Sequence, residues 1–298
     1  MIPVILVVTL VIFILSYLSA GDAARILAEK KYEHPTPVQI EEVRHEEGLD
    51  QPIMVQYGRW LSKAVRGDFG KSYATGKPAI YELKRCFPNT AKLAVSAIII
   101  LVLVSFPLGA LAALFEDRLI DKIIRVFCSL TVAMPSFWLA LMMLYFFGVK
   151  LGMINVIGGS SGTVPILAPI AMDIGFFGIM IRLIRVNMIQ VYKKDFIRTS
   201  LAKGLPMYNV ILKHGAKNIM IPVITRMISI IIGTFCGSAV IESIFSIDGI
   251  GNLALDAVLC KNTPVLQCFI FILAISVVVI NLIVDIIYSL IDRRIQLK

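Results

Sequence analysis

The sequence predicts an all-α, polytopic membrane protein with six transmembrane helices. Three observations support this prediction: 58% of the 298 residues are hydrophobic, only 16% are charged, and the mean hydropathy is +0.84. Soluble globular domains have about 45–50% apolar and about 25% charged residues. The apolar residues also lie in long runs, and a helix needs about 20 such residues to cross the hydrocarbon core of a bilayer.

Six runs have the required length, and each carries at most one charged residue. Asp173 interrupts the fourth run and Arg226 the fifth. Because lipid offers no hydrogen bonds to the backbone, and the runs lack the alternation of barrel strands, we expect helices. The expected spans are 2–21, 93–115, 126–149, 163–181, 219–241 and 264–284.

Residues 1–21 are expected to form the first transmembrane helix. The alternative is a secretory signal peptide, but this segment lacks a basic start, and Leu18-Ser19-Ala20 is a poor cleavage site. We therefore predict a retained helix.

Residues 22–88 are expected to form an extracytoplasmic segment. Breaks at 21–24 and 34–37 open it, and the pattern predicts a polar helix at 38–48 and an amphipathic one at 57–65. With few apolar residues of its own, this segment should cap the outer mouth of the helix bundle. Residues 89–298 should form the core of the protein, with the remaining five transmembrane helices.

The distribution of cations predicts the orientation. Between residues 182 and 217 eight Lys and Arg residues face a single acid, Asp195. The positive-inside rule places this loop, and with it both termini, in the cytoplasm. The net charge of +9 is spread over several such stretches rather than gathered in one patch. It therefore reflects topology, and we expect no nucleic-acid partner.

The usual catalytic arrangements are missing from the sequence. The three histidines and five cysteines form no motif of a metal site, and Gly70-Lys71-Ser72 lacks the upstream glycine of a phosphate-binding loop, since Val65 stands there. We therefore expect no enzyme activity and no bound cofactor. Most of the cysteines are expected to act as small apolar residues in or near the helices.

The basic loop contains a distinct local pattern. Residues 195–205 are predicted to form a short amphipathic helix that ends at Gly204 and Pro206, and a second helix is expected at 210–218. Taken alone, this pattern is more typical of an ordinary surface loop that contacts anionic lipid.

At this point the chain resembles a known family. The loop is similar to the cytoplasmic motif of ABC importer permeases of the peptide/nickel branch, most closely of nickel-import permeases. The residues that carry the resemblance are Phe196-Ile197-Arg198-Thr199-Ser200-Leu201-Ala202-Lys203-Gly204-Leu205, His214-Gly215-Ala216-Lys217-Asn218, Gly67-Asp68-Phe69-Gly70, Met134-Pro135-Ser136-Phe137-Trp138, Ile241-Glu242-Ser243-Ile244-Phe245 and Asn281-Leu282-Ile283-Val284-Asp285.

The sequence departs from the family pattern at a few places. Arg198-Thr199-Ser200 replaces the acidic residue of the general importer motif, and Ala23 and Asp248 stand where many members have proline. The short basic leader that usually precedes the first helix is missing from the given sequence. The resemblance therefore leads us to expect a truncated start.

The resemblance implies a non-catalytic subunit of an ATP-driven importer in a prokaryotic plasma (inner) membrane. The implied partners are a second permease, expected to be a paralogue, two ATP-binding-cassette ATPases that use ATP and Mg²⁺, and an extracytoplasmic substrate-binding protein. A coupling loop at about 186–217 would dock on an ATPase. The residues implied to couple are Phe196, Arg198, Thr199, Ser200, Leu201, Ala202, Lys203, Gly204 and Leu205.

The resemblance favours nickel ions, free or chelated, as the substrate, with di- or oligopeptides as the alternative. Asp173, Glu242 and Cys236 are candidate pathway residues, since a carboxylate at membrane depth is costly and often functional. Pairing of Asp173 with Arg226 across the bundle is an equal alternative. A secondary transporter or channel and a membrane-embedded enzyme are less favoured, because inverted repeats and polar clusters are not visible in the sequence.

Overall fold

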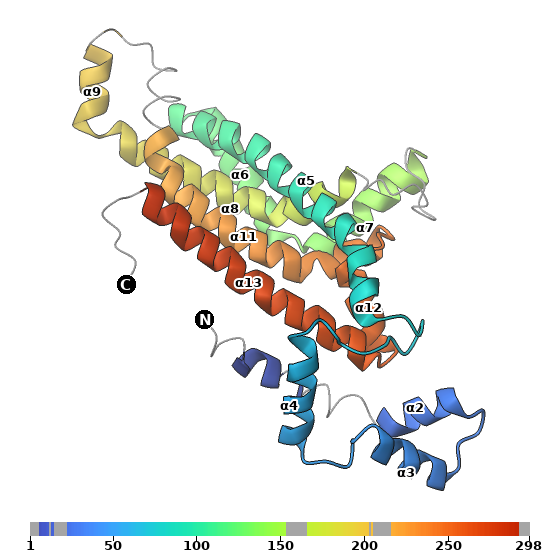
Figure 1. Ribbon diagram of the computed structural model, residues 1–298. Helices are drawn as coiled ribbons and strands as arrows, with labels where there is room; N and C mark the ends of the chain where they lie inside the picture. The colour runs from blue at the N-terminus through green and yellow to red at the C-terminus, as the bar shows by residue number, and fades with distance from the viewer. Residues whose placement is uncertain are drawn as a thin grey trace. The chain divides into compact units, whose positions relative to one another are not determined.

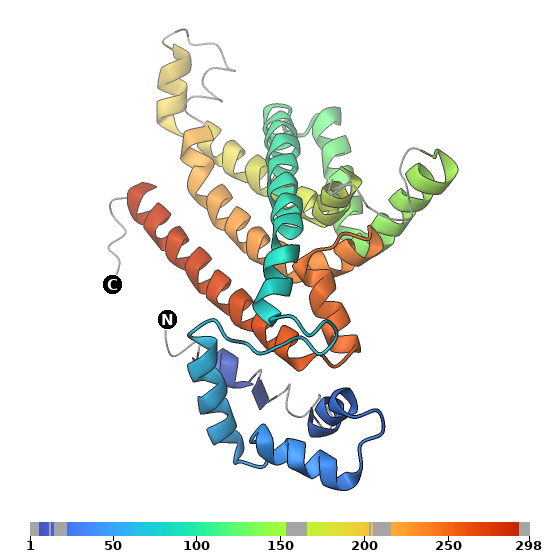
Figure 2. The ribbon, with the colours of Figure 1, turned by 45° about the vertical axis from the view of Figure 1, so that its right-hand side comes forward.

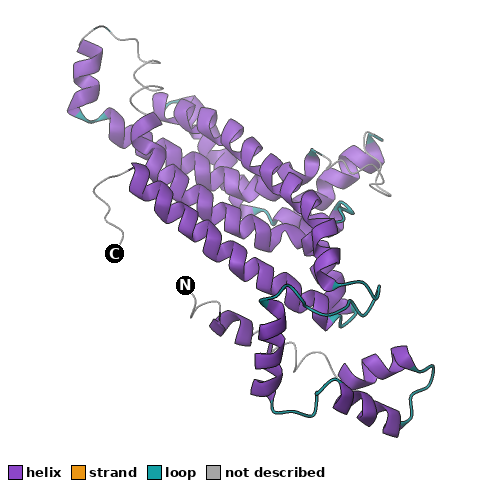
Figure 3. Ribbon diagram, viewed as in Figure 1, coloured by secondary structure: helices purple, strands orange, loops and turns teal. Residues whose placement is uncertain are grey.

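The computed structural model describes residues 6–11, 13–14, 23–152, 166–202, 204 and 216–291. In this part of the chain every regular element is a helix, apart from one isolated bridge between Lys71 and Pro78 (Figure 3). The all-α prediction is therefore confirmed. The chain divides into two compact units, the first comprising Met1–Pro88 and Asn252–Val279, the second Asn89–Gly251 and Ile280–Lys298.

The first unit contains three short helices, α2 (Ala23–Lys31), α3 (Pro37–Glu46) and α4 (Ile53–Ala64). Thr36 caps α3: its hydroxyl accepts the Gln39 amide proton, and its own amide donates to Gln39 Oε1 at 2.9 Å. The predicted helices at 38–48 and 57–65 correspond to α3 and α4. The expected break at 21–24 is wrong for residues 23 and 24, because α2 begins at Ala23.

The core of the first unit joins distant segments. It packs the end of α4, the start of α5 (Ala79–Leu114), α12 (Ile250–Leu259) and the first half of α13 (Thr263–Ile291) around Phe69. Ala79 and Leu83 are buried there. This burial explains why α5 begins well before the apolar run predicted at 93–115.

The second unit is built around α8 (Leu167–Tyr192), which packs against α6 (Leu119–Ala133) and α11 (Ala216–Ile244) (Figure 1). Side chains of α5, α6, α8 and α11 share one buried core. A Cβ at Gly178 of α8 would collide with the Cys128 carbonyl oxygen of α6. The missing side chain therefore lets the two helix backbones approach closely, as in many membrane helix pairs.

Three helices are long and apolar enough to cross a membrane: Ala79–Leu114, Leu167–Tyr192 and the Thr263–Ile283 part of α13. Two bent pairs have the composition of a span when each is taken together, Leu119–Ala133 with Ser136–Lys150 and Ile219–Thr234 with Ser238–Ile244. The predicted first span, 2–21, lies largely outside the described residues. The described part of the chain thus holds three to five candidate spans.

The predicted single helix at 126–149 is wrong. The chain bends by 99° between α6 and the pair formed by α7 (Ser136–Met143) and the π-helix η1 (Leu144–Lys150), as Figure 2 shows. Met134 has the extended angles φ −93° and ψ 132°. The cause is Pro135, which lacks an amide proton and disfavours a helical conformation at the preceding residue.

Candidate functional site

A buried ion pair lies at the end of α8 that leads into the basic loop. Arg185 donates to both carboxylate oxygens of Asp121 on α6, at 2.6 and 2.7 Å. Asp121 is fully buried, and it also accepts the Asp117 amide proton at 2.9 Å. A bidentate pair of this kind fixes both distance and orientation. It therefore holds α6 and α8 in one register at this end of the unit.

The predicted short helix of the loop is present as α9 (Asp195–Ala202). It lies beyond the end of α8 and projects from the helix bundle in both ribbon views (Figures 1 and 2). Ile197 is only 1% exposed and belongs to the same core cluster as α6 and α8. Among the side chains of α9 that the structure describes, Ile197 is the one that anchors the projecting helix to the body of the unit.

The outer side of α9 is polar or small where the structure describes it. Thr199 and Ala202 are exposed, Ser200 is half-buried, and the Thr199 hydroxyl donates to the Asp195 carbonyl oxygen at 3.0 Å. Gly204 is exposed and has a φ of +82°, which favours glycine. The side chains of Phe196, Arg198 and Leu201, residues Lys203 and Leu205, and most of the second predicted helix lie outside the described residues.

Asp173 lies on α8, where it is 1% exposed. Its Oδ2 atom has no hydrogen-bond partner in the ranges that the structure describes. Arg226 is exposed, and in the described part of the chain no ion pair links it to Asp173. The alternative in which these two residues pair is therefore not observed.

Glu242, the second candidate pathway residue, is fully buried in the last turn of α11. Its Oε1 atom accepts a hydrogen bond of 2.7 Å from the Thr90 hydroxyl. A Cβ at Gly249 or Gly251 would collide with the Glu242 carboxyl group, so both glycines make room for it. The sequence did not predict the contact with Thr90, because the two residues lie 152 positions apart.

The cysteines are described only in part. Cys86, Cys128 and Cys268 are buried free thiols and Cys260 is an exposed one, while the side chain of Cys236 lies outside the described residues. Within the described ranges, no three His, Cys, Asp or Glu side chains come together in a group that could hold a metal ion.

Two family models match the chain. Residues 105–297 match the binding-protein-dependent transport system inner membrane component, and residues 1–94 match the N-terminal membrane component of the same systems. The glutathione transport system permease protein GsiC of Shigella boydii, of Escherichia coli K12 and of Salmonella paratyphi A is in each case 32% identical over 301 residues. These alignments cover 100% of this chain and 96% of each relative.

A solved structure shares the fold. The inward-facing MetNI methionine ABC transporter matches with a TM-score of 0.60 at 16% sequence identity. The match covers 72% of this chain and 97% of the MetNI chain.

Proposed function

Since this chain belongs to the family of binding-protein-dependent transport system inner membrane components, we propose that it forms half of the translocation pathway of an ABC importer for short peptides. Membership in this family makes it an ABC importer permease subunit, embedded in the membrane and not itself an enzyme. The observation that carries the substrate proposal is the full-length similarity to glutathione permeases.

A peptide substrate differs from the nickel ions that the sequence pattern favours. Nickel import stays an unconfirmed prediction, whereas relatives at 32% identity over the whole chain are named for transport of glutathione, which is a short peptide. The similarity therefore supports the peptide alternative better than the nickel reading.

The proposed assembly contains this chain, a second permease that is a paralogue, two ATPases that bind ATP and Mg²⁺, and an external binding protein. The assembly lies in a prokaryotic inner membrane. Residues 22–88 face the outside of the cell, whereas the loop at about 186–217 and the C-terminus face the cytoplasm. Family membership supports the ATPase and binding-protein partners in general. The positive-inside rule supports the orientation.

We assign coupling to α9 because of how it is held. A displacement of α9 by a moving ATPase would reach the core through Ile197, which is packed among side chains of α6, α8 and α11. The Asp121–Arg185 pair then links α6 to α8, so that the two helices move together. In this proposal the exposed residues around Thr199 and Gly204 contact the ATPase.

Reconstitution of the complete importer in liposomes tests this function. The vesicles contain ATP and the external medium contains the binding protein with labelled glutathione, a labelled dipeptide or radiolabelled nickel. We expect uptake of a peptide that stops when a non-hydrolysable ATP analogue replaces ATP. Nickel uptake without peptide uptake would overturn the proposal of a peptide substrate. Uptake that does not depend on ATP would overturn the assignment as an ABC importer.

A further inference from the structure

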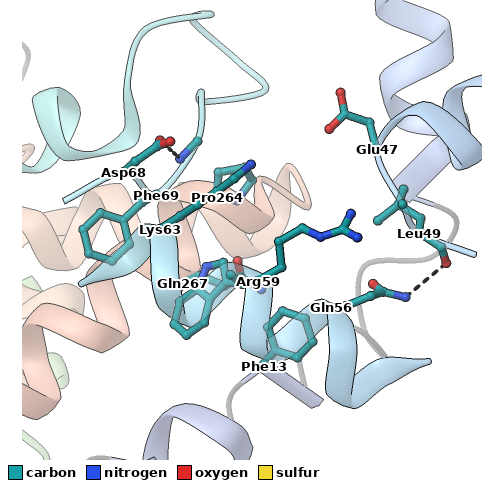
Figure 4. A pocket seen from close by; sticks show the side chains of 13 residues that line it. Phe13, Glu47, Leu49, Gln56, Arg59, Lys63, Asp68, Phe69, Pro264 and Gln267 are labelled. Atoms are coloured by element: carbon teal, nitrogen blue, oxygen red, sulfur yellow. Dashed lines mark hydrogen bonds between the residues drawn. The ribbon is translucent and has the colours of Figure 1, made fainter. Parts of the chain in front are cut away.

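The first unit contains a pocket of about 210 Å³ whose lining mixes apolar and polar side chains (Figure 4). Its walls come from α4, from the turn after α3, from the loop at 68–70 and from the first turns of α13. Phe13, Trp60 and Phe69 supply aromatic surface. With Phe13 the lining comes from five segments of the chain, and a site assembled in this way can present several polar groups to one small ligand.

Unused hydrogen-bond donors line this pocket. Arg59 and Lys63 are one turn apart on α4, and neither forms an ion pair or hydrogen bond with the residues that the structure describes. The Nε1 atom of Trp60 is buried and has no hydrogen-bond partner among the described residues. Gln267 is only 8% exposed and also lines the pocket. Two cations beside a buried, unsatisfied N–H group favour an anionic ligand group such as phosphate.

The Arg59 side chain is already positioned. Figure 4 shows it reaching across the pocket toward Glu47 and Leu49. Its guanidinium group lies so close to Gly48 that a Cβ at residue 48 would collide with it. The missing side chain at Gly48 therefore leaves room for the guanidinium beside the turn after α3.

The pocket also carries negative charge. Asp68 is engaged, since its Oδ1 atom accepts the Gly70 amide proton at 3.0 Å. Glu47 is exposed and forms no ion pair with the described residues. Two cations and two carboxylates make the lining neutral overall. Such a lining matches a zwitterion better than a purely anionic group.

The position of the pocket points to a membrane ligand. Pro264 and Gln267 lie in the first turns of the candidate span Thr263–Ile283. Trp60 also contacts Phe13, Tyr57 and Phe271, with ring centroids 5.8, 6.2 and 6.0 Å apart. Clusters of Trp and Tyr are enriched at the boundary between membrane and water, where lipid headgroups lie.

We propose that this pocket binds the headgroup of a zwitterionic aminophospholipid, represented by phosphatidylethanolamine. The phosphate lies between Arg59, Lys63 and the Trp60 N–H group, and the ammonium group faces Glu47. The pocket volume of about 210 Å³ is sufficient for such a headgroup, because a cavity of about 150 Å³ already accommodates a benzene molecule. The site lies outside the proposed coupling loop and the candidate pathway residues.

Native mass spectrometry of the intact importer tests this site. The complex is titrated with phosphatidylethanolamine or phosphatidylglycerol, and retained lipid is counted. We expect the Arg59→Gln/Lys63→Gln variant to retain phosphatidylethanolamine at least about tenfold less tightly, because two charge-assisted hydrogen bonds are lost. The matched control is Arg66→Gln/Lys71→Gln, which removes two exposed cations outside the pocket.

A second pair of variants separates binding from folding. Trp60→Phe keeps an aromatic ring but removes the N–H group, and should weaken retention of both lipids. Glu47→Gln should shift the preference from phosphatidylethanolamine toward phosphatidylglycerol, a result that misfolding would not produce. Wild-type retention in the double variant would overturn the site. Equal binding of free phosphoethanolamine and of the lipid would overturn the membrane origin of the ligand.

Discussion

The hydroxyl of Thr90 donates a 2.7 Å hydrogen bond to the buried carboxylate of Glu242, although the two residues are 152 positions apart. The same hydroxyl accepts the Ile250 amide proton at 2.8 Å, and Asn89 Nδ2 donates to the Asp248 carbonyl oxygen at 2.8 Å. These bonds tie α5 to the turn between α11 and α12. Two of the three points at which the chain passes between the units, 88/89 and 251/252, adjoin this cluster.

Thr90→Val should destabilise the protein. Valine has nearly the same shape but leaves the Glu242 carboxylate and the Ile250 amide without the hydroxyl, so we expect the free energy of unfolding to fall by about 2–3 kcal/mol. Thermal denaturation in detergent measures the change. Thr90→Ser keeps the hydroxyl and serves as the control; equal melting temperatures of the Val and Ser variants would contradict the role of this bond.

Gly249→Ala should also lower the melting temperature. Its Cβ would collide with the Glu242 carboxyl group, which is fully buried and has little room to move. Overpacking of this kind costs about 1–3 kcal/mol. Gly58→Ala is the matched control, because a Cβ there meets nothing within 4 Å and the residue lies within α4. A loss of stability in the control alone would refute this prediction.

Asp121→Asn should weaken the link between α6 and α8. Arg185 is 15% exposed on its side chain and would be left without its carboxylate, at a cost of about 3–5 kcal/mol. The control is Glu116→Gln, since the Glu116–Lys193 pair spans 3.9 Å on the surface and contributes about 0–1 kcal/mol. Chemical denaturation compares the two variants, and similar midpoints would argue against a structural role of Asp121.

Gly204→Val should reduce transport per ATP hydrolysed. The φ of +82° is unfavourable for a β-branched residue by about 1–2 kcal/mol, so the turn after α9 should change conformation. Gly204→Asn is the control, because asparagine tolerates this region. The ratio of uptake to ATPase activity is the readout, and an unchanged ratio in the Val variant would remove Gly204 from the coupling proposal.

Asp173→Asn should not lower the melting temperature. The substitution keeps the shape of the side chain and removes a buried carboxyl group whose Oδ2 atom has no hydrogen-bond partner among the described residues. Polar groups buried without partners are unfavourable. A drop in melting temperature would reveal a stabilising partner of the carboxylate. With stability retained, loss of uptake in the same variant would support Asp173 as a pathway residue.

Much of the fold was predictable because it depends on local properties. Hydropathy over about 20 residues marks a span, and the pattern of Thr36, Pro37 and Gln39 marks the start of α3. The bend at Pro135 has an equally local cause, yet the unbroken apolar run at 126–149 concealed it. The early start of α5 was not predictable, since Ala79 and Leu83 are helical in contact with a core contributed by α12 and α13.

The candidate sites divide in the same way. The sequence by itself determined the membrane class, the all-helical fold and the short helix α9, because these depend on neighbouring residues. Only the tertiary structure decided that Glu242 meets Thr90 and that Asp121 pairs with Arg185. It likewise shows no pair between Asp173 and Arg226 in the part of the chain that it describes. The physical reason is distance along the chain: such contacts depend on how helices pack, and packing is settled by the shapes of all the side chains together.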